Sequence, residues 1–321
     1  MRLEMKTVVT AGLLAASACA WAQNFPVKPV RIIMPFPAGT SVNDVLGRAL
    51  AQRLSEPLGQ QVIFDNRSGA AGTLGSEMVV KAPPDGYSVL SHGGALAMGA
   101  LMQKMPYDPL KDFAAISWTA SAPLVVTVHP SVPVKSVKEL IALAKARPGA
   151  LNYASTATGS TPHLATELFK HMAGVKITHI PYKGAGAAMI DMISGQVQLI
   201  FAVPNAVVEH AKSGRLRTLA VTSAEPSPLL PGLPTVAASG LPGYESVGIY
   251  GMFTTARTSD AIIRRLHREF VRVLATDEAA KRLRGNALEV VASTPEQFEA
   301  KFRAESARMA QVIQAAGIRM E

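Results

Sequence analysis

Short apolar runs alternate with segments of helical spacing along almost the whole chain. In the helical segments apolar residues recur every three or four positions, as at Leu164, Leu168 and Met172. Runs of strand length lie between them, at 30–34, 61–64, 87–91, 114–118, 124–128, 151–154, 176–180, 197–202, 216–222 and 247–253. Strands that alternate with helices predict an α/β fold with mostly parallel sheets, whose ligand sites lie at the carboxyl ends of the strands.

The beginning of the chain has the pattern of a secretory signal peptide. Basic residues precede a small, apolar stretch at 7–18, and Ala20-Trp21-Ala22 fits an A-x-A cleavage site. We therefore expect cleavage after Ala22 and an exported protein that starts at Gln23. Cys19 stands in a loosely lipoprotein-like context, so lipid modification there is an alternative. Without residues 1–22 the chain has no cysteine for a disulfide, a thiolate nucleophile or a metal site.

Length and charge narrow the class of protein further. About 300 residues exceed what one hydrophobic core usually serves, so two domains are expected. The formal net charge is +9, and it becomes +8 when Arg2, Glu4 and Lys6 are removed with the signal peptide. The basic residues are scattered and form no Lys/Arg run, which favours a small anionic solute over nucleic acid as partner. A merely solvated basic surface would give the same charge.

The segment from Val30 to Arg48 has the order strand, loop and helix. Prolines at 35 and 37 stiffen the loop, and Gly39 lets a ligand approach the backbone closely. At the start of the helix, unpaired N–H groups and the positive dipole end favour a carboxylate or phosphate oxygen. An ordinary turn between strand and helix is the alternative. The candidate ligand-binding residues here are Phe36, Pro37, Ala38, Gly39, Thr40, Ser41 and Asp44.

A second loop of the same kind follows the strand at 151–154. It consists of small and hydroxyl residues, and Pro162 stands near the first position of the next helix, so Ser160 or Thr161 is a natural N-cap. Two such loops, about one per domain, predict a cleft that closes on a solute. The candidate residues in this loop are Ser155, Thr158, Gly159, Ser160 and His163.

Several short segments together resemble one known family. In chain order they are Pro35-Phe36-Pro37-Ala38-Gly39 with Asp44 and Arg48, Asn66-Arg67-Ser68-Gly69-Ala70-Ala71-Gly72, Pro84-Asp85-Gly86-Tyr87, Pro106-Tyr107-Asp108-Pro109 with Asp112-Phe113, Gly159-Ser160 with His163-Leu164, Pro181-Tyr182-Lys183-Gly184, Leu216-Arg217 with Ala220-Val221-Thr222, and Leu233-Pro234-Thr235. The chain resembles the Bug-type periplasmic solute receptors of tripartite tricarboxylate transporters over nearly its whole mature length.

The resemblance implies a two-domain α/β fold of the periplasmic-binding-protein kind with a ligand cleft between the domains. We expect residues 23–122 and 225–321 to form domain 1 and residues 123–224 to form domain 2, with hinge strands near 120–126 and 222–226. It further implies a monomeric periplasmic receptor without a cofactor, whose backbone amides hold a small mono- or dicarboxylate and whose partners are membrane transporter subunits. The sequence departs from the family pattern at Thr40-Ser41-Val42-Asn43, where one residue is extra, and at Ala157, where glycine is common.

Selectivity for the far end of the ligand is expected at two further strand ends. One group, with Ser91 and His92, comes just after Leu90 at the end of one strand. The other, from Phe201 to Asn205, lies at the end of the strand that stops near Ala202. An ordinary strand-end turn is the alternative for both.

Other functions compete with the receptor. An exported hydrolase could use Ser160 with His163 and Asp44 or Asp191, although no G-x-S-x-G motif surrounds Ser160. A receptor that serves a sensor kinase in place of a transporter is another alternative. The histidines include no H-E-x-x-H motif or close pair, so we expect no metal site.

Overall fold

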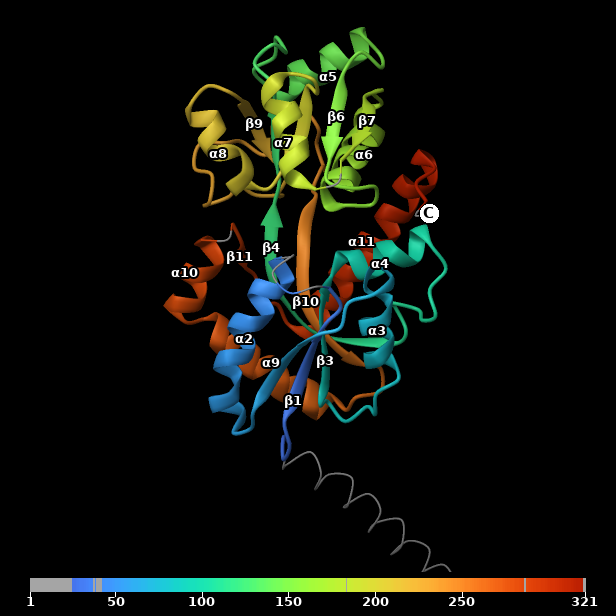
Figure 1. Cartoon of the computed structure of the whole chain (residues 1–321), viewed down its shortest axis with the longest axis vertical. Helices are drawn as coiled ribbons and strands as arrows, with labels where there is room; N and C mark the ends of the chain where they lie inside the picture. The colour runs from blue at the N-terminus through green and yellow to red at the C-terminus, as the bar shows by residue number, and fades with distance from the viewer. Residues whose placement is uncertain (1–24, 37, 39–41, 183, 286, 320–321) are drawn as a thin grey trace, which may run out of the picture.

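The fold contains two sheets at opposite ends of an elongated molecule (Figure 1). The computed structural model describes residues 25–319 except 37, 39–41, 183 and 286. One sheet has the strand order β11 (Glu289–Val290), β4 (Phe113–Pro123), β10 (Val247–Thr255), β3 (Ser88–Gly93), β1 (Val30–Met34) and β2 (Val62–Asn66). The other has the order β7 (Thr178–Pro181), β6 (Asn152–Ser155), β8 (Leu199–Ala202), β5 (Val125–Val128) and β9 (Arg217–Val221).

Helices cover the faces of both sheets, as the alternating pattern predicted. Those of the six-stranded end are α2 (Val42–Leu58), the short 3₁₀ helix η1 (Ala70–Gly72), α3 (Thr73–Val80), α4 (Gly94–Met102), α9 (Asp260–Leu274), α10 (Asp277–Gly285) and α11 (Pro295–Ala316). Those of the five-stranded end are α5 (Val137–Ala146), α6 (Thr161–Ala173), α7 (Ala185–Ser194) and α8 (Pro204–Lys212). None of the helices within the described residues is long and apolar enough to cross a membrane.

Local sequence signals explain where the last helix begins and ends. Thr294 accepts a hydrogen bond from the Gln297 amide, and the Gln297 side chain accepts one from the Thr294 amide, so the two form a capping box. Pro295 fits the first helical position, and Gly317 ends the helix in the left-handed conformation. The sequence therefore defines both ends of α11, Pro295–Ala316.

Parallel strands place six helix starts at two edges. Strand β1 pairs in parallel with β2 and β3, so their carboxyl ends share one edge, where α2, α3 and α4 begin. Strand β6 pairs in parallel with β7 and β8, and α6, α7 and α8 begin at the corresponding edge of the other sheet. The two edges face each other in Figure 1, with α2 beginning at the upper end of its sheet and β6 pointing down toward it.

The chain crosses between the sheets at a small hydrogen-bonded junction. The chain leaves the six-stranded sheet where β4 passes into β5 of the five-stranded sheet. This passage is at Leu124, within the first expected crossing at 120–126. The return occurs at Ser246, directly before β10. Within the segment 222–246, Thr235 bridges to Val221 of the five-stranded sheet, and Ser227 Oγ donates to Glu289 of β11 in the six-stranded sheet. Thr222 joins both crossings: its Oγ1 accepts from the Leu124 amide at 2.7 Å, and its carbonyl accepts from the Ser246 amide at 2.8 Å. Of the second expected crossing, 222–226, only its start thus lies at the junction.

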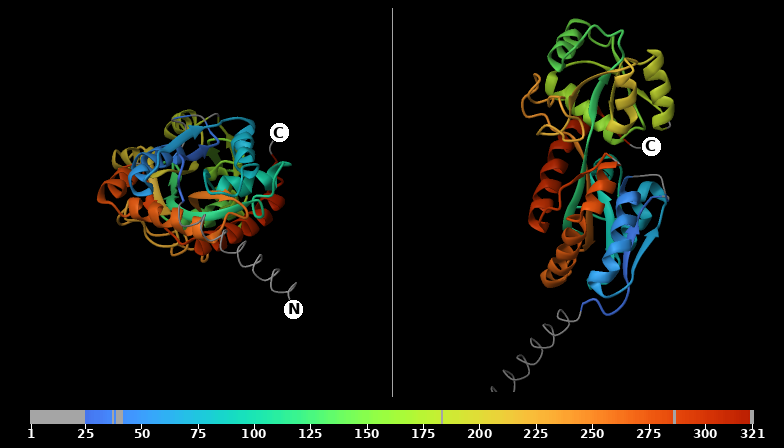
Figure 2. Two further views of the ribbon diagram at one scale, coloured as in Figure 1. Left: turned by 90° about the horizontal axis from the view of Figure 1, so that it is seen from below. Right: turned by 90° about the vertical axis from the view of Figure 1, so that its left-hand side faces the viewer.

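The hydrophobic core is continuous between the two ends on one side only. A single cluster of buried residues includes Leu90 of β3, Tyr153 of β6, Phe169 of α6 and Phe298 of α11. Two separate clusters lie under α2 and α9 at one end and under α7 and α8 at the other. Helix α11, red in Figure 2, lies at the level of the junction. The helix therefore packs against both ends of the molecule.

Candidate functional site

The first predicted loop is tied to the neighbouring strand β2. Asp44 is buried; its Oδ1 accepts from Asn66 Nδ2 at 2.7 Å, and its Oδ2 accepts from Arg48 Nε at 3.0 Å. Asn66 Nδ2 also donates to the Phe36 carbonyl at 3.0 Å. These contacts fix the start of α2 relative to the end of β1, and Arg48 compensates the charge of Asp44. Ala38 is exposed, and Pro37, Gly39, Thr40 and Ser41 lie outside the described residues.

Two polar side chains end strand β3 beside this loop. Because side chains alternate along a strand, Ser91 and His92 point to opposite faces of the sheet. Ser91 Oγ is fully buried and has no hydrogen-bond partner in the described structure. The His92 ring contacts the Phe36 ring edge-on, with centroids 5.3 Å apart. The expected neighbours Phe36 and His92 are thus brought together, and Ser91 lies on the other face.

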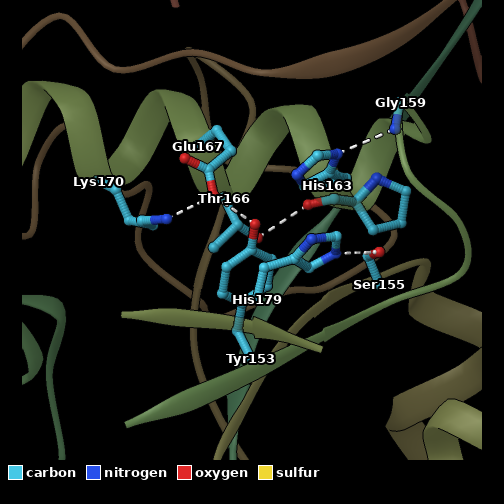
Figure 3. A network of polar contacts seen from close by, with 9 residues as sticks. Tyr153, Ser155, Gly159, His163, Thr166, Glu167, Lys170 and His179 are labelled. Atoms are coloured by element: carbon cyan, nitrogen blue, oxygen red, sulfur yellow. Dashed lines mark hydrogen bonds and ion pairs between the residues drawn. The ribbon is translucent and has the colours of Figure 1, made fainter. Parts of the chain in front are cut away.

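The second predicted loop is fixed by two imidazole rings (Figure 3). The Gly159 amide donates to His163 Nδ1 at 2.9 Å, and Ser155 Oγ lies 2.7 Å from His179 Nε2. The two rings stack in parallel with their centroids 4.0 Å apart, and Tyr153 stacks on His179 at 4.8 Å. His163 therefore holds the loop from the first turn of α6, and His179 holds it from β7.

The rings are neutral and lie near a buried charged group. Burial, assisted by the neighbouring His179, lowers the pKa of His163 to about 4. Beside the rings, on α6, Glu167 accepts hydrogen bonds from Tyr153 Oη and Lys170 Nζ. At neutral pH His163 Nδ1 is consequently unprotonated and can accept from the Gly159 amide.

The six helices that follow parallel strands differ from the others at their first turns. Helices α3, α4, α6, α7 and α8 have no side-chain N-cap and no acidic residue in the first turn. Helix α2 has Asp44 there, already paired with Arg48. By contrast α5, α9, α10 and α11 all carry an acidic residue in the first turn. At five of the six helix starts on the facing edges, the positive dipole end is therefore not compensated by a side-chain cap or an acidic first-turn residue.

Comparison with known proteins identifies the family. The family model described as the tripartite tricarboxylate transporter family receptor, TctC, matches residues 46–318. Protein BugT of Bordetella pertussis is 36% identical over 317 residues, which cover 98% of this chain and 96% of BugT. The chain belongs to the TctC receptor family. Its members are periplasmic solute-binding receptors and not enzymes, so the resemblance inferred from the sequence is confirmed.

Solved structures agree with the two-domain binding-protein fold of the TctC receptor. The structure of Rpa4515 of R. palustris with adipate has a TM-score of 0.74 at 36% identity, covering 92% of this chain and 99% of that one. A TctC solute-binding protein from Polaromonas, solved with no ligand, has a TM-score of 0.83 at 28% identity, covering 91% and 99%. The unliganded protein is thus closer in shape although it is less similar in sequence.

The hydrolase hypothesis for this TctC receptor is wrong. Ser160 Oγ donates to the Ala157 carbonyl at 2.7 Å, and His163 Nδ1 already accepts from Gly159. Asp191 accepts instead from Tyr182 Oη at 2.7 Å. Ser160 occupies the N-cap position of α6 without capping it through its side chain. The first-turn amides of α6 are consequently open to solvent or to a ligand.

Of the two residues expected near the end of β8 to contact the far end of the ligand, one was predicted wrongly. Phe201 is fully buried, with its ring between Phe169 and Tyr244 at centroid distances of 5.5 and 6.5 Å. It is a core residue and offers no surface to a ligand. Asn205, in the first turn of α8, and Thr158, in the second loop, are both exposed.

Four residues that position the candidate site were not among the predicted site residues. They are Asn66, Glu167, Lys170 and His179. Two of them could have been found from the sequence. Asn66 belongs to one of the segments that resemble the family, and His179 is a polar residue inside a strand, β7, which is a signal of a functional or positioning role. Among the described residues, no group of three or more His, Cys, Asp or Glu side chains is arranged to hold a metal ion.

One surface groove of the TctC receptor lies elsewhere, between α2 and α9. It has a volume of about 440 Å³ and is lined by Gln52, Arg53, Glu56, Pro57, Arg272, Val273 and Thr276. These residues lie toward the carboxyl ends of both helices, where the dipole disfavours an anion. Arg53 is moreover paired with Glu278. We therefore place the candidate anion site at the facing edges and not in this groove.

The buried histidines predict a loss of stability in mild acid. Burial lowers the pKa of His92, like that of His163, to about 4. The unfolded chain protonates near pH 6.5, so it binds more protons below that pH. Stability is complete above about pH 7 and should fall as the pH drops toward 4, by about 1.4 kcal/mol per pH unit for each histidine. Urea unfolding at pH 7, 6 and 5 measures this slope.

His163→Gln provides the comparison for that pH profile. The variant removes one of the titrating groups, so its stability should fall less steeply between pH 7 and 5 than that of the wild type. Equal slopes in the two proteins would show that His163 does not titrate abnormally.

Proposed function

We propose that this TctC receptor captures a small organic carboxylate between its two facing sheet edges and delivers it to the membrane subunits of a tripartite tricarboxylate-type transporter. The carboxylate would be held by main-chain N–H groups in the loops after β1 and β6, with α2 and α6 directing their positive ends at it. The chain would reach the periplasm through the signal peptide at residues 1–22.

One observation carries the proposal: five of the six helix starts at the facing edges lack a compensating negative group, and in the sixth, α2, Asp44 is paired with Arg48. Five helices there have neither a side-chain cap nor an acidic first turn, whereas all four helices that begin elsewhere have an acidic residue. An anion placed between the edges would satisfy N–H groups that are otherwise left to water. The adipate bound to Rpa4515, a related protein, supports a carboxylate.

The available interactions suffice for useful affinity. A hydrogen bond to a charged group contributes roughly 1.5–3 kcal/mol, and a helix N-terminus adds about 0.3–1 kcal/mol. Three to five such contacts, less the cost of ordering and closure, approach the roughly −8 kcal/mol of micromolar binding. Backbone donors accept many carboxylates alike, so selectivity is left to side chains at the far end of the ligand.

We further propose that the two ends close on the ligand by rotation at the junction of Leu124, Thr222 and Ser246. The greater likeness in shape to the unliganded Polaromonas protein than to adipate-bound Rpa4515 supports an open arrangement here. Because Thr235 bridges to Val221 of the five-stranded sheet, the moving units would be 25–123 with 247–319, and 124–246. This division extends the inserted domain beyond the boundary expected from the sequence.

Isothermal titration of the processed protein with adipate tests the proposed function. We expect saturable binding with a Kd near the micromolar range and recovery of adipate unchanged. Hexane-1,6-diol, which has the same length and no charge, should not bind, because it cannot satisfy the uncompensated helix starts. Absence of binding by every acid in a panel of organic carboxylates, or accumulation of a product with time, would contradict the proposal.

A further inference from the structure

Helix α9 carries four arginines on one side. With 3.6 residues per turn, they fall within about 100° of arc around the helix axis. They are Arg264, Arg265, Arg268 and Arg272. The buried apolar residues of α9 lie on the opposite side. The helix therefore turns an arginine face, made of these four residues, away from the core.

Much of the charge on the arginine face is not neutralised. Glu269, the acidic residue among the arginines, is only 3% exposed, and its Oε1 accepts from Arg265 Nη1. Arg268 Nε and Arg272 Nη1 lie 3.5 and 3.9 Å from the oxygens of the same carboxylate, and their side chains are 65% and 74% exposed. One buried carboxylate thus serves three arginines, so positive charge remains at the surface.

The excess charge is centred on the second half of α9. Arg264, at the start of the face, pairs with Asp260 at 3.2 Å and lies near Glu296 of α11. Beyond α9 the basic character continues into α10, where Lys281 and Arg284 are exposed. Eight basic and four acidic residues lie within 257–285, a net charge of +4. This short segment thus holds half of the +8 that remains without residues 1–22.

The arginine face is an open flank of a helix and not a pocket. Of its four arginines, only Arg272 lines the groove between α2 and α9. An extended negative surface contacts several side chains of such a flank at once, whereas a small solute contacts one or two. The arginine side chain also suits phosphate, because its planar group donates two parallel hydrogen bonds. The face therefore fits an extended surface of phosphate groups.

The same end of the molecule receives the start of the chain. Helix α9 lies at the end remote from the five-stranded sheet, near the beginning of β1 (Figures 1 and 2). Phe25, the first described residue, packs edge-on against Tyr87 with ring centroids 4.9 Å apart. A Cβ added to Gly86 would meet both Phe25 and Ile262 in the first turn of α9. The signal peptide expected at residues 1–22 would thus attach the chain to the membrane at this end before its cleavage.

We propose that the arginine face of α9 binds the negatively charged headgroups of a phospholipid bilayer. Arginines on an amphipathic helix each strengthen binding to an anionic bilayer by about fivefold. Contact is made by the ends of side chains on the flank of the helix, so the dipole at its carboxyl end has little influence. The proposal concerns a surface separate from the carboxylate site, and the two can fail independently.

Co-sedimentation of the processed protein with phospholipid vesicles tests this proposal. We expect binding to vesicles of phosphatidylglycerol, and binding at least about tenfold weaker to vesicles of the zwitterionic phosphatidylcholine. Binding to phosphatidylglycerol should be lost in about 0.5 M salt, which screens exposed charges. No binding to phosphatidylglycerol at low salt would overturn the proposal and leave an acidic protein as the partner of this face.

Two matched double variants locate the contact. Arg268→Gln with Arg272→Gln removes two exposed charges, and binding should weaken by about tenfold or more. The contact between Arg265 and Glu269 is left in place, so the fold should be retained. Lys138→Gln with Lys145→Gln removes two exposed charges from α5, at the opposite end of the molecule. This control should change binding by less than about twofold.

The comparison separates a local contact from the effect of net charge. Equal weakening in the two double variants would show that net charge alone matters and would overturn the role of the arginine face. Circular dichroism shows whether each variant is folded. Arg272→Gln alone should weaken binding by about fivefold, and it decides the question if the double variant on α9 does not fold.

Discussion

Gly93→Ala should destabilise the protein by about 4 kcal/mol or more, or prevent it from folding. An added Cβ would lie 1.7 Å from the carbonyl oxygen of Ile249 in β10, which is an impossible contact with backbone that cannot move aside alone. The pairing of Tyr250 with Gly93 at the centre of the six-stranded sheet would have to open. Urea unfolding followed by circular dichroism, or the yield of soluble protein, measures the effect.

The adjacent glycine offers a matched control. A Cβ added to Gly94 would have Ile249 Cβ as nearest atom at 3.8 Å, an ordinary contact, and Gly94 is the first residue of α4. Gly94→Ala should therefore leave stability within about 1 kcal/mol of the wild type, or raise it through helix propensity. If the two variants were equally stable, the close approach of β3 to β10 at Gly93 would be incorrect.

Lys170→Met should lower stability by about 3 kcal/mol. Lys170 Nζ is the cationic partner of Glu167, and their side chains are only 19% and 9% exposed. Without the lysine, the carboxylate would stay buried with only the Tyr153 hydroxyl as described partner. Breaking a buried ion pair from one side is costly because the remaining charge is uncompensated. Chemical unfolding at pH 7.5 measures the loss.

The double variant Glu167→Gln with Lys170→Met distinguishes a stranded charge from lost packing. The neutral amide oxygen introduced by Glu167→Gln can still accept from Tyr153, so most of the stability lost in Lys170→Met should return. A double variant no more stable than Lys170→Met alone would assign the loss to packing of the lysine stem against Tyr153, whose ring centroid lies 5.3 Å from Nζ.

The sequence predicted the elements better than the directions of their side chains. Every expected strand exists, because runs such as Leu199–Ala202 are apolar throughout and short. Phe201 was predicted to contact the far end of the ligand because it stands near a strand end. Its pairing with Val126 instead directs its side chain into the core. A buried strand has apolar residues on both faces, so its sequence does not show which residue faces a ligand.

Contacts between segments that are distant in the sequence could likewise not be predicted from it. His163 and His179 are separated along the chain, and they stack only because β6 and β7 pair in parallel with Tyr153 beside His179. No spacing motif connects them. The two strand, loop and helix segments were recognisable, since prolines, glycines and helix periodicity are local signals, whereas the residues that hold them depend on sheet order.

The apolar cluster shared by both ends of the molecule would limit the route of the proposed carboxylate. Along α11 this cluster joins the two halves, and a charged acid cannot pass through it without losing its hydration. In the proposed function, entry and exit of the carboxylate would therefore occur on the side turned away from α11. A membrane subunit that received the acid would approach from this same side, with the C-terminal helix facing away from it.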